Sequence, residues 1–135
     1  MRADWKILLL WPLAVILAAI CFETGCPADD VSAADARFFR EEVLPLLKDS
    51  CQRCHGAQKQ NSSLRLDSRE AVIKGGQNGP AIVVGKPDES LLMKVLKHDG
   101  DIQMPPDEKL DDDDIEIFRK WIEKNAPWPA DKKSS

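Results

Sequence analysis

The first pattern along the chain is an apolar run behind two basic residues. Arg2 and Lys6 precede the run, which covers residues 7–22. A basic start followed by an apolar run is typical of a secretory signal peptide, and this run is shorter than the roughly 20 residues of a membrane-spanning helix. Small residues at the positions that a signal peptidase reads predict cleavage after Ala33. We therefore expect residues 1–33 to be a signal peptide.

Two alternatives remain for this segment. The stretch between Phe22 and Ala33 is long for a cleavage region, which leaves an uncleaved N-terminal anchor possible. Cys26 follows a glycine as a lipidated cysteine would, but Glu23 stands where such a site has an apolar residue. We expect an exported, periplasmic protein that is membrane-anchored only if the segment is retained.

Apolar positions then recur at helical spacing. Phe39, Val43 and Leu46 or Leu47 predict a helix over residues 34–47, capped by Asp35. Pro45 should kink this helix or end it one turn early.

A second, short helix is predicted over residues 69–74, between a capping Ser68 and a stop at Gly75. Pro87 suits the first position of a third helix, which should end near residues 98–100.

The last helix has the clearest pattern. Asp111 is its expected cap, and Asn125 can take the left-handed position that ends it. Its predicted buried residues are Ile115, Phe118, Trp121 and Ile122. The sequence thus predicts an all-α domain over residues 34–129 and a disordered tail over residues 130–135.

Composition and charge narrow the range of functions that this protein could have. The formal net charge is −4 at pH 7, so a nucleic-acid partner is not expected. A domain of this size has little surface to bury, and a large apolar cofactor would supply the missing core.

The strongest chemical signal is the motif Cys51-Gln52-Arg53-Cys54-His55. Two cysteines at this spacing can each form a thioether to one haem vinyl group, and the adjacent histidine can then ligate the iron. The alternatives are a disulfide, half of a zinc site and a redox dithiol. Zinc would need two further ligands, and a redox dithiol would want a preceding strand instead of a helix.

A six-coordinate iron needs a second axial ligand. Met104 lies in an irregular segment before two prolines, whose restricted backbone can hold a thioether in place. Met93 lies among apolar residues at helical spacing and is predicted to fill the core. His98 is the alternative ligand and would lower the reduction potential, although its charged neighbours favour a solvent-facing position.

A set of spaced motifs accompanies these residues from about Phe38 to Pro129. They are Phe39, Val43, Leu46, Cys51–His55 with Gly56, Leu64-Arg65-Leu66-Asp67-Ser68, Gly75-Gly76, Gly79-Pro80-Ala81, Gly85-Lys86-Pro87, Ser90-Leu91-Leu92, Met104-Pro105-Pro106, Trp121-Ile122 and Ala126-Pro127-Trp128-Pro129. Together they resemble the planctomycete-type cytochrome c domain, a branch of the class I monohaem cytochrome c fold.

The resemblance implies N- and C-terminal helices that cross beside one covalently bound haem c. It implies Cys51 and Cys54 as attachment points, with His55 and Met104 as axial ligands. The expected function is the transfer of single electrons between a redox donor and an acceptor protein, both unknown, and not enzymatic catalysis. The alternative is a haem-based ligand sensor or a peroxidase-like enzyme with an open or labile sixth position.

Three further residues are predicted around the haem. The second ring nitrogen of His55 needs an acceptor, for which the backbone at Gly79-Pro80 is the candidate. Arg53 and Arg65 are candidate partners for the haem propionates, and either could equally be a solvated surface arginine.

Overall fold

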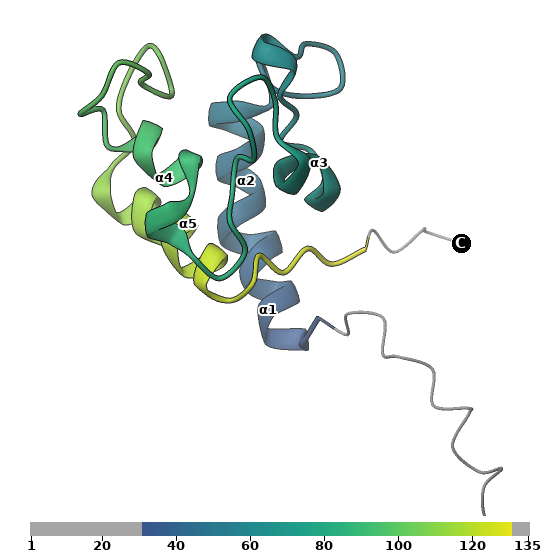
Figure 1. The fold of residues 1–135 in the computed structure, drawn as a ribbon. Helices are drawn as coiled ribbons and strands as arrows, with labels where there is room; N and C mark the ends of the chain where they lie inside the picture. The colour runs from purple at the N-terminus through teal and green to yellow at the C-terminus, as the bar shows by residue number, and fades with distance from the viewer. Residues whose placement is uncertain (1–30, 131–135) are drawn as a thin grey trace, which may run out of the picture. The chain divides into compact units, whose positions relative to one another are not determined.

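The computed structural model describes residues 31–130, which form helices and loops without a strand (Figure 1). The predicted all-α class is confirmed. No helix in this part of the chain is long and apolar enough to cross a membrane. Almost all of the predicted signal peptide, residues 1–33, and of the predicted tail, residues 130–135, lies outside the described residues.

The domain begins with one long helix, which Figure 1 shows as a continuous rod. Its four consecutive parts are α1 (Ala33–Phe38), η1 (Phe39–Val43), α2 (Leu44–Leu46) and η2 (Leu47–Cys51). The prediction that Pro45 could end the helix early is wrong, because the backbone stays in the right-handed helical region across these junctions. The kink that was predicted as the alternative stays a prediction. Pro45 lacks an N–H and donates no main-chain hydrogen bond. The hydrogen bonds around it are of the π-helical type and span five residues instead of four, as from the Leu44 N–H to the Phe39 carbonyl.

The first helix also starts one residue earlier than predicted, and its cap is Ser32 instead of Asp35. The Ser32 hydroxyl oxygen accepts the Asp35 backbone N–H at 3.0 Å, and the hydroxyl donates to the Asp35 carboxylate at 2.7 Å. The serine satisfies an N–H at the start of the helix, and the acidic side chain stabilises that serine. Cleavage after Ala33 would remove this cap, and the cleavage position stays a prediction.

The second helix matches its prediction. It is α3 (Arg69–Lys74), and the Ser68 hydroxyl oxygen accepts the Ala71 N–H at 3.2 Å. Gly75 ends the helix with a φ of 73°, a left-handed conformation that glycine adopts without a steric penalty.

The third predicted helix is divided in two by Ser90. The parts are η4 (Pro87–Glu89) and α4 (Leu91–Leu96), and Ser90 between them has an extended backbone. The buried Ser90 hydroxyl accepts the Val83 N–H at 2.9 Å and donates to the Lys86 carbonyl at 2.8 Å. These bonds tie the loop before η4 to the start of α4 and break the helix.

The last helix, α5 (Asp112–Glu123), follows Asp111 and ends before Asn125, whose φ is 67°. Asp111 occupies the cap position, but its side chain makes no capping hydrogen bond. The predicted helix and its stop are thus confirmed, and the side-chain role of Asp111 is not.

Aromatic packing joins the first and last helices. The ring centroids of Phe39 and Trp121 lie 6.2 Å apart, and those of Phe39 and Trp128 lie 4.6 Å apart. Phe118, Trp121 and Ile122 are fully buried, as predicted, while Ile115 is half-buried. The Trp121 ring N–H donates to the Pro127 carbonyl at 2.9 Å, so the segment after α5 is fixed to the same core.

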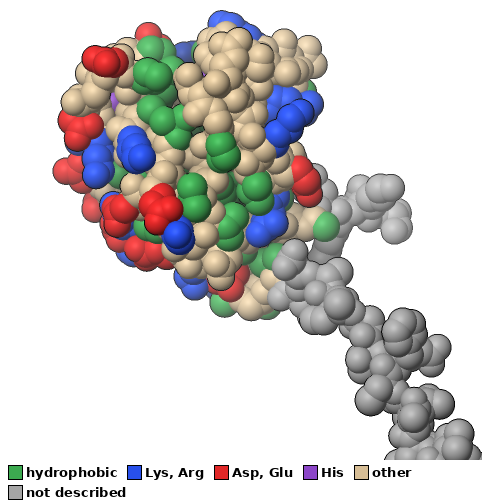
Figure 2. All heavy atoms as spheres, in the orientation of Figure 1, with side chains coloured by type: hydrophobic (Ala, Val, Ile, Leu, Met, Phe, Trp, Pro, Cys, Tyr) green, Lys and Arg blue, Asp and Glu red, His purple; other side chains and the backbone are tan. Residues whose placement is uncertain are grey.

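Charged side chains of both signs cover the side of the domain on which α4 and α5 lie (Figure 2). One ion pair there joins η4 to α5, with the Arg119 guanidinium 2.9 Å from the Asp88 carboxylate. The Arg119 hydrogen bond holds the pKa of the Asp88 carboxyl below its ordinary value.

Candidate cofactor site

A cavity of about 300 Å³ lies where the end of the long helix meets α4 and three loops. Most of its wall is apolar. The apolar lining residues are Leu64, Leu66, Ala81, Leu91, Leu92, Val95, Leu96, Ile102, Met104, Pro105 and Pro106. The face of α4 that the sequence marks as apolar therefore forms part of the wall of this cavity.

The cysteine motif lies at one wall, where the long helix ends in a turn. The Cys54 and His55 N–H groups both donate to the Cys51 carbonyl, at 3.1 and 2.9 Å. This turn places the side chains of all three residues on the same cavity. The chain then turns back, and the Asn61 N–H donates to the Cys54 carbonyl at 3.0 Å.

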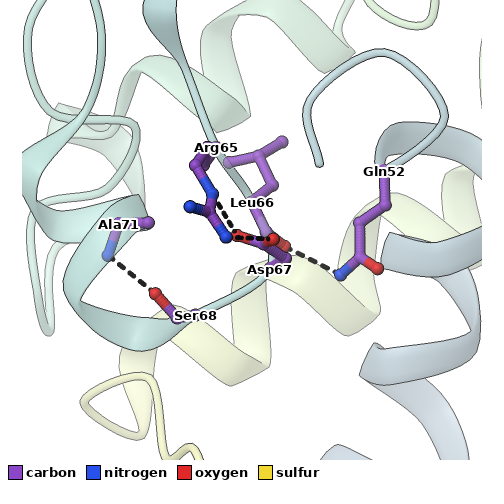
Figure 3. A network of polar contacts seen from close by, with 6 residues as sticks. All are labelled: Gln52, Arg65, Leu66, Asp67, Ser68 and Ala71. Carbon is purple, nitrogen blue, oxygen red and sulfur yellow. Dashed lines mark hydrogen bonds and ion pairs between the residues drawn. The ribbon is translucent and has the colours of Figure 1, made fainter. Parts of the chain in front are cut away.

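The neighbouring loop around Leu66 holds this turn in place. The Gln52 side chain donates to the Leu66 carbonyl at 3.0 Å (Figure 3), and the Leu66 N–H donates to the His55 carbonyl at 2.7 Å. Gly56 is needed directly after the motif, because a Cβ atom there would meet the Gln52 carbonyl oxygen. The position of the histidine is thus set by bonds to its main chain.

The two cysteines are free thiols. Burial raises the pKa of the Cys51 thiol to about 11, so this thiol is protonated at neutral pH. The His55 side chain is also buried, and its Nδ1 has no hydrogen-bond partner among residues 31–130. The Nε2 of His98 is buried without a partner in the same way, so what distinguishes His55 as a candidate ligand is that it lines the cavity.

Met104 approaches the cavity from the loop beyond α4. Its N–H donates to the Val95 carbonyl at 3.1 Å, which ties the loop back to that helix. Met93 is buried and does not line the cavity, so its prediction as a core residue is confirmed. His98 lies on the same loop as Met104 but does not line the cavity, and its Nε2 is buried without a partner among the described residues.

Of the remaining predicted site residues, Arg53 lines the cavity, and Arg65 and Pro80 do not. Arg65 does not line the cavity, and its guanidinium lies 2.7 Å from the Asp67 carboxylate (Figure 3). Arg53 lines the cavity and lies 3.5 Å from Asp107. Pro80 is exposed and outside the lining, so its roles and those of both arginines toward a cofactor stay predictions.

One polar part of the wall was not predicted from the sequence. Asn61, Ser62 and Asn78 line the cavity, and the Gln77 N–H donates to the Ser62 carbonyl at 2.9 Å, which brings their two loops together. Neither loop has a periodic pattern, so the sequence gives no sign that they meet.

These residues fit a covalently held haem. Two thiols, one imidazole with an unpartnered nitrogen and one thioether surround a single apolar cavity. Its size lies at the lower end of the range of cofactor sites, about 300–1,000 Å³. No three His, Cys, Asp or Glu side chains in the described part of the chain gather as a protein-only metal site requires, so nothing there favours the zinc alternative.

Comparison with known proteins agrees with this site. The family model described as planctomycete cytochrome c matches residues 51–108. The match begins at Cys51 and ends beyond Met104, so it includes the attachment motif and the loop on the other side of the cavity. No curated protein and no solved structure matches the chain. The match over residues 51–108 thus supports a planctomycete-type cytochrome c domain, the type of domain found in c-type haem proteins.

Proposed function

We propose that this protein is an exported monohaem c-type cytochrome that transfers single electrons between redox partner proteins. Cys51 and Cys54 hold the haem by thioether bonds, and His55 and Met104 are its axial ligands. When bound, the haem supplies one-electron redox chemistry, and the chain supplies attachment, ligation and an apolar environment.

The observation that carries this proposal is that His55 and Met104 line the same apolar cavity. An imidazole and a thioether together saturate the iron and raise its reduction potential relative to two imidazoles. His98 does not line the cavity, which favours Met104 over it. With both axial positions filled by the chain, no position is open for oxygen or peroxide, and electron transfer is the chemistry that remains.

Export is part of the proposal. The basic start and the apolar run of residues 7–22 support delivery to the periplasm, where haem attachment to cysteines and diffusion between redox proteins are both possible. The partners are proposed to be one donor and one acceptor protein, and membrane association requires that the N-terminal segment be retained.

Carbon monoxide binding to the reduced protein tests the proposal against a ligand sensor or a peroxidase-like enzyme. With Met104 on the iron, the full holoprotein should bind carbon monoxide slowly or weakly without denaturant. Met104→Ala should bind it rapidly, and Met93→Leu should behave as the natural protein does, because Met93 lies in the core. Rapid binding by the natural protein would favour the sensor or the enzyme instead.

A further inference from the structure

The loop between α4 and Met104 is closed on itself. The chain leaves α4 at Leu96 and returns at Met104, whose N–H donates to the Val95 carbonyl at 3.1 Å. Residues 97–103 thus form a loop with both ends at the C-terminal end of α4. The position of the Met104 side chain in the cavity depends on the conformation of this loop.

One side chain crosses the loop from its end to its beginning. The Gln103 amide donates to the His98 carbonyl at 3.1 Å and to the Gly100 carbonyl at 3.4 Å. His98 has a φ of 58°, a left-handed conformation that is unfavourable for a residue other than glycine. A hydrogen bond to its carbonyl helps to keep the backbone there in this conformation.

The two hydrogen bonds of the Gln103 side chain lie next to Met104, the proposed ligand. Gln103 precedes Met104 directly, so the side-chain bonds of Gln103 and the main-chain bond of Met104 fix two consecutive residues against α4 and the loop. Gln103 itself is exposed and does not line the cavity, so it contacts no cofactor there. Any effect on the iron must pass through the placement of Met104.

We infer that Gln103 is a positioning residue for the Met104 thioether, which it holds at the iron by fastening the loop of residues 97–103. This inference rests on the proposed ligation by Met104. An iron–thioether bond competes with external ligands, and a loose loop lowers the fraction of molecules in which the thioether is in place. External ligands should then bind more tightly.

Two substitutions in the full holoprotein separate this role from an effect of charge. Gln103→Glu keeps the length of the side chain and removes its N–H donors at neutral pH, and Gln103→Leu removes the donors without adding a charge. Gln58→Glu is the matched control, because Gln58 is exposed on another loop, does not line the cavity and makes no side-chain hydrogen bond among residues 31–130. The readouts are imidazole binding to the oxidised protein and the far-red sulfur-to-iron absorption band.

Both Gln103 variants should bind imidazole about three- to tenfold more tightly than the natural protein, the factor expected for the loss of one neutral hydrogen bond. Their far-red band should weaken, and Gln58→Glu should change neither readout. Unchanged affinity in both Gln103 variants would overturn the inference while the proposed function stood. An effect in Gln103→Glu alone would also overturn it, because charge would be the cause. Absence of the far-red band from the natural protein would overturn the proposed ligation and this inference together.

Discussion

His55 and Met104 line the same cavity, although one follows the long N-terminal helix and the other lies beyond α4. Separate main-chain bonds hold them. The His55 carbonyl accepts the Leu66 N–H at 2.7 Å, and the Met104 N–H donates to the Val95 carbonyl at 3.1 Å. Each side chain can therefore be replaced without removing the bonds that position the other.

The proposed covalent attachment of haem can be tested at the two cysteines. Replacing both Cys51 and Cys54 by alanine should make all haem extractable by acidified organic solvent, because no thioether bond remains. The natural protein, expressed with a haem-attachment system, should retain its haem under the same extraction. Ser50→Ala is the control, since Ser50 lines the same cavity and is no attachment point. Haem that stays covalently bound to the double variant would contradict the assignment of the motif.

The end of α3 should tolerate no side chain at Gly75. This glycine has a φ of 73°, and a Cβ atom would meet the Gly79 carbonyl oxygen. Gly75→Ala should lower the free energy of unfolding by more than about 1 kcal/mol, measured by denaturant titration of the holoprotein. At Gly100, a Cβ atom would meet nothing within 4 Å, so Gly100→Ala should be neutral or mildly stabilising. Equal effects of the two substitutions would show that the α3 turn is not constrained in this way.

Stability in acid should depend on the ion pair between Asp88 and Arg119. The hydrogen bond from Arg119 lowers the pKa of the folded Asp88 carboxyl below its ordinary value. The pair therefore contributes stability above that value, and the contribution is lost as the pH falls through the lower pKa of the folded state. Asp88→Asn should unfold more easily than the natural protein above about pH 5, and the difference should vanish toward about pH 2.

Asp49→Asn provides the comparison for this experiment. Asp49 is exposed on the long helix and makes no ion pair among the described residues. At neutral pH its substitution should change the free energy of unfolding less than Asp88→Asn does. A pH-independent effect of Asp88→Asn would mean that the pair contributes nothing through its charge.

The stability of the domain should depend on the hydrogen bond that the Trp121 ring N–H donates. Trp121→Phe keeps an aromatic ring but leaves the Pro127 carbonyl without its donor in a buried region. The cost should be about 1–3 kcal/mol in the free energy of unfolding. Trp128→Phe should cost less, because this indole is half-buried and its ring nitrogen makes no hydrogen bond among residues 31–130. The prediction fails if the two variants are equally stable.

Local signals account for the parts of the fold that were predicted correctly. Ser68 and Gly75 mark the two ends of α3 within a few residues of each other, and Asn125 ends α5 in the same way. The CxxCH spacing likewise requires no tertiary information. Such features can be read from sequence because the residues that cause them are neighbours in the chain.

The features that were missed depend on tertiary contacts. Ser90 breaks a helical pattern because its hydroxyl bonds to a loop that packs there only in the folded domain. Pro45 remains inside a helix whose hydrogen bonds widen on either side of it. Arg65 is basic and close to the motif in sequence, yet Asp67 binds it outside the cavity wall. Periodicity marked the apolar face of α4 but could not show that a cavity lies against it.

The most direct test of the central claim is the optical spectrum of the oxidised and reduced holoprotein, with Met104→Ala and Met93→Leu beside it. The natural protein should show covalently retained haem, sharp low-spin bands and a weak far-red sulfur-to-iron band. That band should be absent from Met104→Ala and present in Met93→Leu. A high-spin spectrum of the natural protein, or a far-red band that survives in Met104→Ala, would contradict ligation by His55 and Met104.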